Sequence, residues 1–287
     1  MKIGSQAHKE LFCQSFMASH LKYEPENLPW PKLDDATLAR LRGIPFWEEA
    51  FDTERNAGVM LSAFAKEVSD PLLREAIALQ AMEESRHSRM IEFLINHYGI
   101  ETPMRPAKEI PHNIELAFTK FGYGECFDSF FAFGLFEIAR HSGFFPEQFF
   151  AIFNPILDEE ARHMVFFVNW IAYHQVNQGR GLLRPAHSLW YYTAAIRHRL
   201  DSFMGGNKSK DASFTATGAA SVSVDLTLDK FLETCIEENE RRMSVYDERL
   251  LRPQMMPSLA KAALGAIRLL PQRQSPPKDE ATRLAGS

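Results

Sequence analysis

Apolar and polar residues follow one another along most of the chain at the three- and four-residue spacing of amphipathic helices. Capping residues and helix stops divide this pattern into segments. Asp70 followed by Pro71 is typical of a helix start, and Gly99 and Gly179 are typical of helix ends. The pattern predicts four long helices, at about 46–67, 71–98, 113–142 and 146–177.

Shorter helices are expected on both sides of these four. Their predicted ranges are 5–21, 34–43, 183–204 and 227–250. The apolar segment 255–270 is expected to pack on the long helices, and Leu28 to Pro31 forms an extended linker. The only alternating, strand-like pattern lies at 214–224 and is weak. The sequence therefore predicts an all-α fold.

Pro155 lies inside the last of the four long segments. Because proline removes a backbone donor, it predicts a kink or a division of that helix, or a plain helix start. We divide the chain into an N-terminal helical extension at 1–45, a four-helix unit at 46–178, C-terminal helices at 179–270 with a mobile loop at 205–224, and a disordered tail at 271–287.

Bulk composition narrows the class of protein. The chain has 287 residues and a formal net charge of −5, which gives no electrostatic case for binding nucleic acid. Its 3 cysteines are too few for a disulfide framework, and this favours a reducing compartment. No stretch is apolar enough for stable membrane insertion, and the N-terminal residues lack the apolar core of a secretory signal. We expect a cytoplasmic protein.

The string Glu-Glu-x-Arg-His occurs twice, at 83–87 and at 159–163. Each copy contains a glutamate and a histidine three residues apart, which share one face of a helix. These pairs are Glu84 with His87 and Glu160 with His163. Two such pairs on facing helices, joined by one further glutamate from each of two other helices, can hold two metal ions.

The two further glutamates follow from hairpin geometry, because antiparallel helices bring together residues that are equally far from the turn. Glu54 and Glu84 are equally far from position 69, beside the helix start at Asp70. Glu125 and Glu160 are equally far from the turn signal at 142–146. Other acids would need a turn where the sequence has no helix breaker, and these are Glu48, Glu49, Glu115 and Glu137.

Charged runs on helices are normally solvated, so one Glu-x-x-His alone is weak evidence for a metal site. Here both copies have apolar neighbours, and each has a matching glutamate across a turn. Burying so many acids without compensation would be prohibitive, and two cations would provide that compensation. The predicted metal ligands, which are also the predicted catalytic residues, are Glu54, Glu84, His87, Glu125, Glu160 and His163.

This set resembles the ferritin-like di-iron carboxylate superfamily, and within it the branch of ribonucleotide reductase small subunits and bacterial oxygenases. Gly124-Glu125-Cys126-Phe127 is loosely similar to a stretch of the aldehyde-deformylating oxygenases. The resemblance covers about 46–177. It implies a ferritin-like four-helix bundle with two Fe ions, with Mn or a mixed Mn/Fe pair as alternatives. It also implies one Glu-x-x-His pair per metal and an O2-dependent oxygenase or oxidase.

The expected partners follow from this chemistry. They are O2, a small and largely apolar substrate, and an external electron-donor protein, because the sequence has no flavin, nicotinamide or iron–sulfur motif. The alternative function is an iron-handling or peroxide-detoxifying protein of the ferritin or rubrerythrin kind. The length of the chain and the lack of paired Cys-x-x-Cys motifs disfavour it. The oligomeric state stays open, a homodimer included.

Two secondary expectations concern the surroundings of the ligands. Metal-bound histidines donate their second N–H to an acid or a carbonyl, and the candidate acids are Asp128, Asp158 and Glu159. Arg86 and Arg162 either pair with such acids or, as we favour, face solvent. A cluster of phenylalanines is favoured as ordinary core over the wall of an apolar substrate pocket, and it comprises Phe127, Phe130, Phe131, Phe133, Phe136, Phe149, Phe150 and Phe153.

Overall fold

The protein is represented by a computed structural model that describes residues 1–103, 105–204 and 227–269. These residues form helices and no strand, which confirms the all-α prediction for the described part of the chain. The predicted loop at 205–224, the weak alternating pattern at 214–224 and the predicted tail at 271–287 lie outside the described residues.

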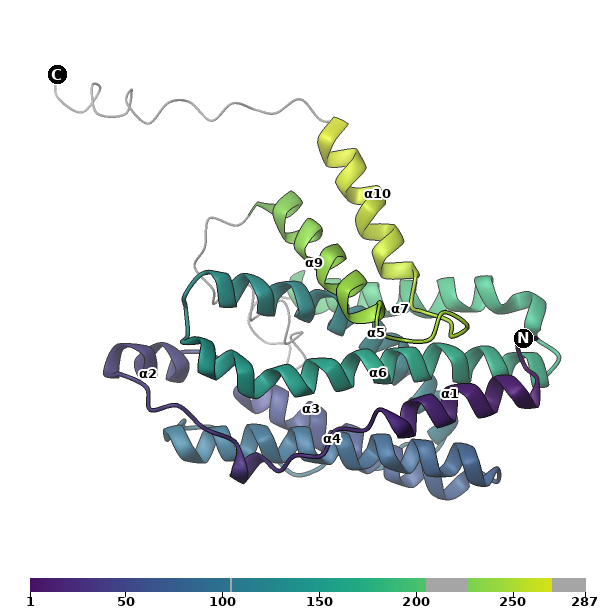
Figure 1. The fold of residues 1–287 in the computed structure, drawn as a ribbon, viewed down its shortest axis with the longest axis horizontal. Coiled ribbons are helices and arrows are strands. Elements are labelled where there is room, and N and C mark those ends of the chain that lie inside the picture. The colour runs from purple at the N-terminus through teal and green to yellow at the C-terminus, as the bar shows by residue number, and fades with distance from the viewer. Residues whose placement is uncertain (104, 205–226, 270–287) are drawn as a thin grey trace.

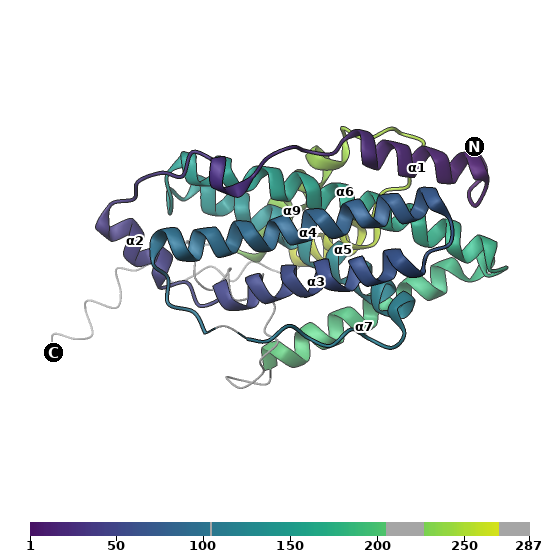
Figure 2. The ribbon, with the colours of Figure 1, turned by 90° about the horizontal axis from the view of Figure 1, so that it is seen from below.

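Four long helices lie alongside one another over the length of the molecule (Figures 1 and 2). They are α3 (Trp47–Glu67), α4 (Pro71–Tyr98), α5 (Ile114–His141) and α6 (Glu147–Asn177). Helix α3 packs along α4, α5 packs along α6, and further contacts join α3 to α5 and α4 to α6. All four match the predicted segments to within about one residue at each end.

Local signals account for the ends of these helices. The Asp70 carboxylate accepts hydrogen bonds from the backbone N–H groups of Leu72 and Leu73 and so caps α4. At the other end, Gly99 has a φ of 59°, a left-handed conformation that glycine adopts without strain. Helix α6 runs through Pro155 without a break, so the alternatives in which this proline divides or starts the helix were wrong.

Five further helices surround the four long ones within the described residues. They are α1 (Gln6–Ala18), α2 (Asp35–Arg42), α7 (Arg184–Met204), α9 (Leu228–Met243) and α10 (Met255–Leu269), with short 3-10 turns η1 (Pro25–Asn27) and η2 (Gly181–Leu183). Helix α1 packs on α4 and α6, α7 and α9 pack on α5, and α10 packs on α9 and α5.

The predicted helix at 227–250 is shorter in the structure and ends at Met243. The chain turns after this residue, and Asp247 accepts a hydrogen bond from the backbone N–H of Arg249. Aspartate competes with helical hydrogen bonding in this way, which explains why the helix does not continue.

Two separate hydrophobic clusters fill the interior. The larger cluster contains Ile77 of α4 and Leu61 of α3, and the smaller one contains Leu94 of α4 and Phe51 of α3. Each of these helices therefore contributes to both clusters. Between them, a polar layer crosses the interior at the level of the two Glu-Glu-x-Arg-His strings.

The burial of the eight clustered phenylalanines mostly confirms the prediction that they are ordinary core. Four of the eight are almost completely buried, and these are Phe130, Phe133, Phe149 and Phe150. Phe131 is partly buried and stacks on Phe231 of α9, with ring centroids 5.9 Å apart. Phe149 and Phe153 belong instead to the smaller cluster. Among the described residues, no helix is long and apolar enough to cross a membrane.

Candidate metal centre

The polar layer between the two clusters contains all six residues predicted as metal ligands. Glu54 comes from α3, Glu84 and His87 from α4, Glu125 from α5, and Glu160 and His163 from α6. The structure brings them together as two groups in which one ligand atom per residue lies within 4.8 Å of the others. Either group has the composition and spacing to hold a metal ion.

Glu84 and Glu160 belong to both groups. The first group adds Glu54 and His87, and the second adds Glu125 and His163. Sequence alone left open which glutamates would bridge two ions, and the resemblance implied one Glu-x-x-His pair per metal. Each group does contain one complete Glu-x-x-His pair, Glu84 with His87 or Glu160 with His163, and the geometry adds that Glu84 and Glu160 are members of both groups.

The Nδ1 atom of each histidine ring points among the carboxylates. His87 Nδ1 lies 3.2 Å from Glu160 Oε1, and His163 Nδ1 lies 3.0 Å from Glu84 Oε1. Both nitrogen atoms are nevertheless buried without a hydrogen-bond partner. The carboxylate oxygens therefore lie close to each nitrogen but not along the direction of a hydrogen bond.

This arrangement fits a metal ion. Ligand atoms that share one first-row metal at about 2.1 Å lie no more than about 4.2 Å apart. Each histidine Nδ1 lies 3.0 to 4.0 Å from a carboxylate oxygen of every glutamate in its group, which is within this limit. A buried nitrogen without a partner, surrounded by carboxylates, is the donor that such an ion would satisfy. Imidazole and carboxylate together suit iron or manganese.

A close helix contact sets the position of α3 against α4 beside the ligands. Gly58 lies one turn after Glu54, and a Cβ atom at this glycine would lie 2.5 Å from Ser85 Oγ and 3.1 Å from the Ser85 backbone nitrogen. Any larger residue would therefore push the two helices apart. Since Ser85 follows Glu84 directly, Gly58 holds the two ligand helices close together at the level of the site.

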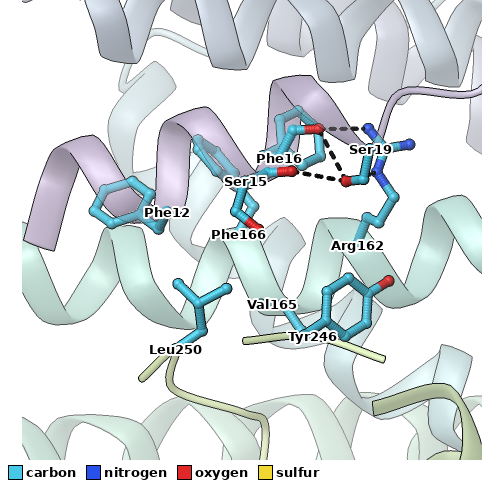
Figure 3. A pocket seen from close by; sticks show the side chains of 9 residues that line it. All are labelled: Phe12, Ser15, Phe16, Ser19, Arg162, Val165, Phe166, Tyr246 and Leu250. Atoms are coloured by element: carbon cyan, nitrogen blue, oxygen red, sulfur yellow. Dashed lines mark hydrogen bonds between the residues drawn. The ribbon is translucent and has the colours of Figure 1, made fainter. Parts of the chain in front are cut away.

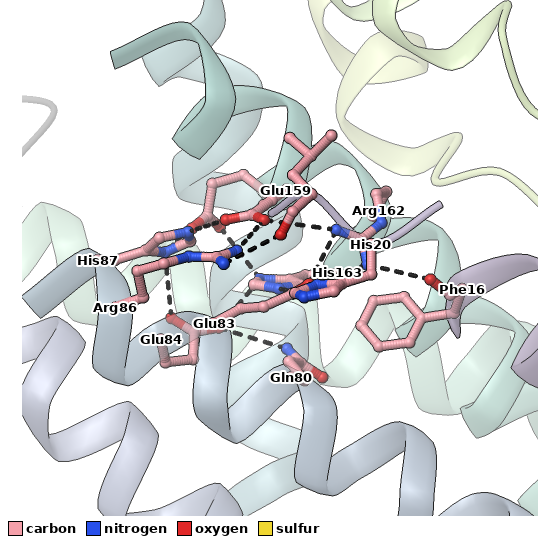
Figure 4. Close-up of polar contacts among 12 residues, drawn as sticks. Phe16, His20, Gln80, Glu83, Glu84, Arg86, His87, Glu159, Arg162 and His163 are labelled. Carbon is pink, nitrogen blue, oxygen red and sulfur yellow. Dashed lines mark hydrogen bonds and ion pairs between the residues drawn. The ribbon is translucent and has the colours of Figure 1, made fainter. Parts of the chain in front are cut away.

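The outward-facing nitrogen of each histidine binds a glutamate of the other string. His87 Nε2 lies 2.9 Å from Glu159 Oε2, and His163 Nε2 lies 2.9 Å from Glu83 Oε2 (Figure 4). These contacts fix the orientation of both rings, as expected for histidines that ligate a metal. Glu159 was among the predicted acids, whereas Glu83 was not.

The arginines of the two strings complete this outer network. Arg162 donates to Glu83 Oε1 from two nitrogens at 3.0 and 3.1 Å, and Arg86 donates to Glu159. Both arginine side chains are less than 5% exposed, so the favoured prediction that they face solvent was wrong. Because Glu83 and Glu159 are completely buried, each needs a cation beside it.

Of the other predicted acids, Asp158 pairs with an arginine instead. Asp158 is 57% exposed and pairs with Arg242 at 2.5 Å. Asp128 is half-buried on α5. The two acids that meet the Nε2 atoms come from one repeated position, the first glutamate of each string.

Residues 16–23 of the N-terminal extension cover this outer network. His20 Nδ1 lies 2.6 Å from Glu83 Oε1, and the Tyr23 hydroxyl donates to Glu159 Oε2 at 2.9 Å. The arginines donate back to this segment, Arg86 to the Leu21 carbonyl and Arg162 to the Phe16 carbonyl. Sequence reasoning missed these contacts because they join positions more than 60 residues apart with no motif in the N-terminal segment.

His20, Glu83 and Glu159 also have the spacing of a small metal group. Each of the two glutamates, however, already binds one arginine and one histidine. Their charge is therefore compensated by the protein itself. We assign this group to the support of the candidate metal centre and not to a further ion.

The pKa values of Glu83, in the outer network, and of Glu84, among the candidate ligands, are both lowered although both side chains are buried. Burial alone would raise the pKa of Glu83, but the hydrogen bond and charge of His163, together with Arg162, lower it to about 2. Burial likewise opposes the ionisation of Glu84, yet the charge of His163 holds the pKa of Glu84 well below its ordinary value. Both carboxylates are therefore ionised near neutral pH.

The pKa values of Glu54 and Glu125, which each belong to one group only, are shifted in the opposite direction. Burial, reinforced by the charges of Glu84 and Glu160, raises the pKa of Glu54 to about 8 and that of Glu125 well above its ordinary value. Against the effect of burial, the charge of Glu84 and the hydrogen bond to Glu83 raise the pKa of His163 to about 10. Without metal, this layer therefore retains protons that cations would displace.

A small cavity adjoins Arg162 between α1, α6 and the turn after α9 (Figure 3). Its volume is about 10 Å³, which is room for a single water molecule. Ser19, Phe16 and Tyr246 line it beside the arginine. This cavity is too small for a substrate and belongs to the outer network.

Comparisons of the chain with models of protein families, with curated proteins and with solved structures found no match. The functional argument therefore depends on the geometry of the residues themselves.

The buried ion pair between Arg162 and Glu83 predicts a large loss of stability when the arginine is replaced. Arg162→Met should leave Glu83 buried with reduced compensation and lower the free energy of unfolding by about 3–5 kcal/mol. The matched control is Arg89→Met, because Arg89 forms an exposed pair with Glu24 that should contribute no more than about 1 kcal/mol. Urea unfolding of the metal-free proteins measures both, and equal effects would contradict the assigned role of Arg162.

Proposed function

We propose that the chain is a ferritin-like four-helix bundle enzyme that binds two iron ions, with manganese as an alternative, and uses O2 to oxidise a small, largely apolar substrate. One observation carries this proposal. Two four-residue groups share Glu84 and Glu160, and each contains a buried histidine nitrogen without a hydrogen-bond partner. Two ions held by these residues, with Glu84 and Glu160 common to both, would satisfy all of these atoms at once.

The chain's own residues have distinct parts in this proposal. Glu84 and Glu160 would hold both ions, whereas Glu54 and Glu125 would each bind one. Glu83 and Glu159 would keep the histidine rings turned inward and their Nε2 atoms protonated. Bound in the ferrous state, the ions would supply electrons to O2.

If each carboxylate gave one oxygen, the four residues of a group would leave coordination positions open on an iron or manganese ion. Those positions are where O2 would reach the centre. Replacement of the electrons requires an external electron-donor protein, and this partner stays a prediction from the sequence.

The smaller hydrophobic cluster supports an apolar substrate. Phe153 lies two helical turns before Glu160 on the same face of α6, about 10 Å along the axis. It contacts Trp30 edge-on, with ring centroids 6.1 Å apart. Trp30 also lines a surface groove of about 350 Å³, together with Leu38, His97 and Tyr98. We propose that the substrate enters through this groove and lies beside Phe153.

Iron loading and reaction with O2 test the function. The protein would be loaded with ferrous iron without oxygen and mixed with O2 while its absorption spectrum is followed, with and without candidate apolar substrates. We expect a substrate to accelerate the decay of the oxidised spectrum and to yield an oxygenated or desaturated product. Deposition of many ferric ions per chain without any effect of substrate would establish iron storage instead.

Phe153→Trp offers a sharper test of the substrate position. The larger side chain should reduce turnover several-fold by filling the proposed substrate position beside Phe153, without changing the metal content. Phe131→Trp is the matched control, because Phe131 packs on Phe231 of α9, away from the centre. Product formation and iron content are measured for both. Equal turnover in the two variants would place the substrate elsewhere.

A further inference from the structure

The turn η2 and helix α7 carry the largest group of exposed apolar side chains that occur together in the described part of the chain. Leu182 is 99% exposed and Trp190 is 72% exposed, and Leu183 and Leu189 are also more than half exposed. Figure 2 shows α7 at the outer edge of the molecule, with the four long helices on one side of it only. We call these four side chains the α7 patch.

The opposite face of α7 already packs against the protein. Tyr192 is buried and meets Tyr123 of α5 edge-on at 5.1 Å, and Tyr191 stacks on the same ring. The Tyr123 hydroxyl is also hydrogen-bonded to Ser188. The inner face therefore fixes α7 on α5, and the apolar residues of the outer face contribute nothing to that attachment.

Charge distinguishes this surface from the rest of the chain. No aspartate or glutamate occurs between positions 178 and 197, whereas the whole chain has a formal net charge of −5. Arg180 precedes the α7 patch and Arg197 follows it, and both are exposed. The surface is thus apolar in the middle and positively charged at both ends.

We propose that the α7 patch docks the protein reversibly on a membrane surface that contains anionic lipids. Leucine and tryptophan side chains on one face of a helix enter the boundary between headgroups and acyl chains, where tryptophan is favoured. Arginines at the ends of the patch bind anionic headgroups. The contact is peripheral, since none of the described helices can span a membrane.

A second copy of the chain fits this surface less well. A twofold contact through the α7 patch would bring Arg180 and Arg197 of both copies together, and positions 178–197 contain no acid to compensate them. Such a contact repels itself, whereas an anionic lipid surface attracts the same groups. The docking proposal is independent of the proposed oxidation chemistry, because it rests only on α7 and η2.

Vesicle flotation tests the proposal with the full-length protein. We expect binding to vesicles of phosphatidylcholine with phosphatidylserine, and little binding to phosphatidylcholine alone. Added salt should weaken the interaction, because it screens the arginines. Absence of binding to the anionic vesicles would overturn the proposal.

Two pairs of variants identify the surface that binds. Leu189→Ser combined with Trp190→Ser should weaken vesicle binding at least about tenfold, since both apolar groups would otherwise leave water. Val245→Ser is the control, because Val245 is 78% exposed outside α7 and should not matter. Equal binding by both proteins would overturn the assignment to the α7 patch.

The charge variants are Arg180→Glu with Arg197→Glu, compared with Arg249→Glu as an exposed control. The double reversal should abolish the preference for anionic vesicles, and the control should retain it. Circular dichroism verifies that each variant is folded, and light scattering measures its mass. A dimer that dissociates when Trp190 is replaced, in a protein that does not bind vesicles, would assign the surface to a second copy.

Discussion

Glu84→Gln is expected to remove both metal ions, whereas Glu54→Gln and Glu125→Gln should each remove about one. The reason is the sharing of ligands between the two groups. Glu84 belongs to both, while Glu54 and Glu125 each belong to a single group. An amide keeps the size of the side chain but loses the negative charge that joins two cations.

Metal content per chain, measured after loading with ferrous iron without oxygen, decides this prediction. The matched control is Glu75→Gln, which changes an exposed glutamate two and a half turns earlier on the same helix and should keep the full content. A Glu84→Gln protein that retains as much metal as Glu54→Gln would show that Glu84 is not shared. One ion or none in the folded, loaded parent protein would contradict the two-metal proposal itself.

The six candidate ligands could be predicted because helix geometry is local. A Glu-x-x-His places two ligands on one face, and the turn signals at Asp70 and at 142–146 fix which residues of the neighbouring helix lie opposite. Glu54 and Glu125 follow from that reflection, and the structure brings both to the expected level. Neither argument, however, gives the rotation of one hairpin against the other.

The rotation of one hairpin against the other decides which glutamates the two groups share. It also decides where the residues of the outer network lie. Glu83, Arg86 and His87 lie within one turn, so a helix that turns His87 inward also carries the other two inside. The repetition of the whole string was therefore a signal for a buried network, because equivalent positions in two facing copies have equivalent surroundings. Treating each charged run by itself gave the wrong prediction for Arg86 and Arg162.

The contacts of His20 and Tyr23 lacked any such signal. They depend on where an irregular segment after α1 lies across α4 and α6, and that path is set by long-range packing. Likewise, the stacking of Phe131 on α9 could not be predicted from a phenylalanine-rich helix that is apolar on several faces. The sequence pattern identified Phe131 as apolar but not its partner, and it gave no signal for His20 or Tyr23.

Metal removal is expected to destabilise the protein more strongly as the pH rises from 6 to 8. In the metal-free chain, the pKa of Glu54 is raised from 4.5 to about 8 and that of His163 from 6.5 to about 10. A raised pKa in the folded state contributes stability below the unfolded-state value, and this contribution is lost as the pH approaches the folded-state value. The metal-free protein should therefore lose stability through this whole interval.

Bound cations reverse this dependence, because they replace the retained protons and bind more tightly as those protons leave. Glu83 acts in the opposite sense. Its pKa of about 2 contributes stability above 4.5 that is lost only in acid, so it does not affect the interval from pH 6 to 8. The stability gained from metal should accordingly grow by several kcal/mol, which is a rise of about 10 °C in the melting-temperature difference.

Calorimetry of the metal-free and manganese-loaded proteins at pH 6 and pH 8 measures this difference, since manganese avoids oxidation during heating. Glu54→Gln provides the internal control, because the amide cannot titrate and the metal-free variant should depend less on pH over the same interval. A melting-temperature difference that stays constant or shrinks toward pH 8 would mean that the ions do not displace protons from these residues. The cations would then bind outside the buried layer, since only a site within it replaces the protons of Glu54 and His163 directly.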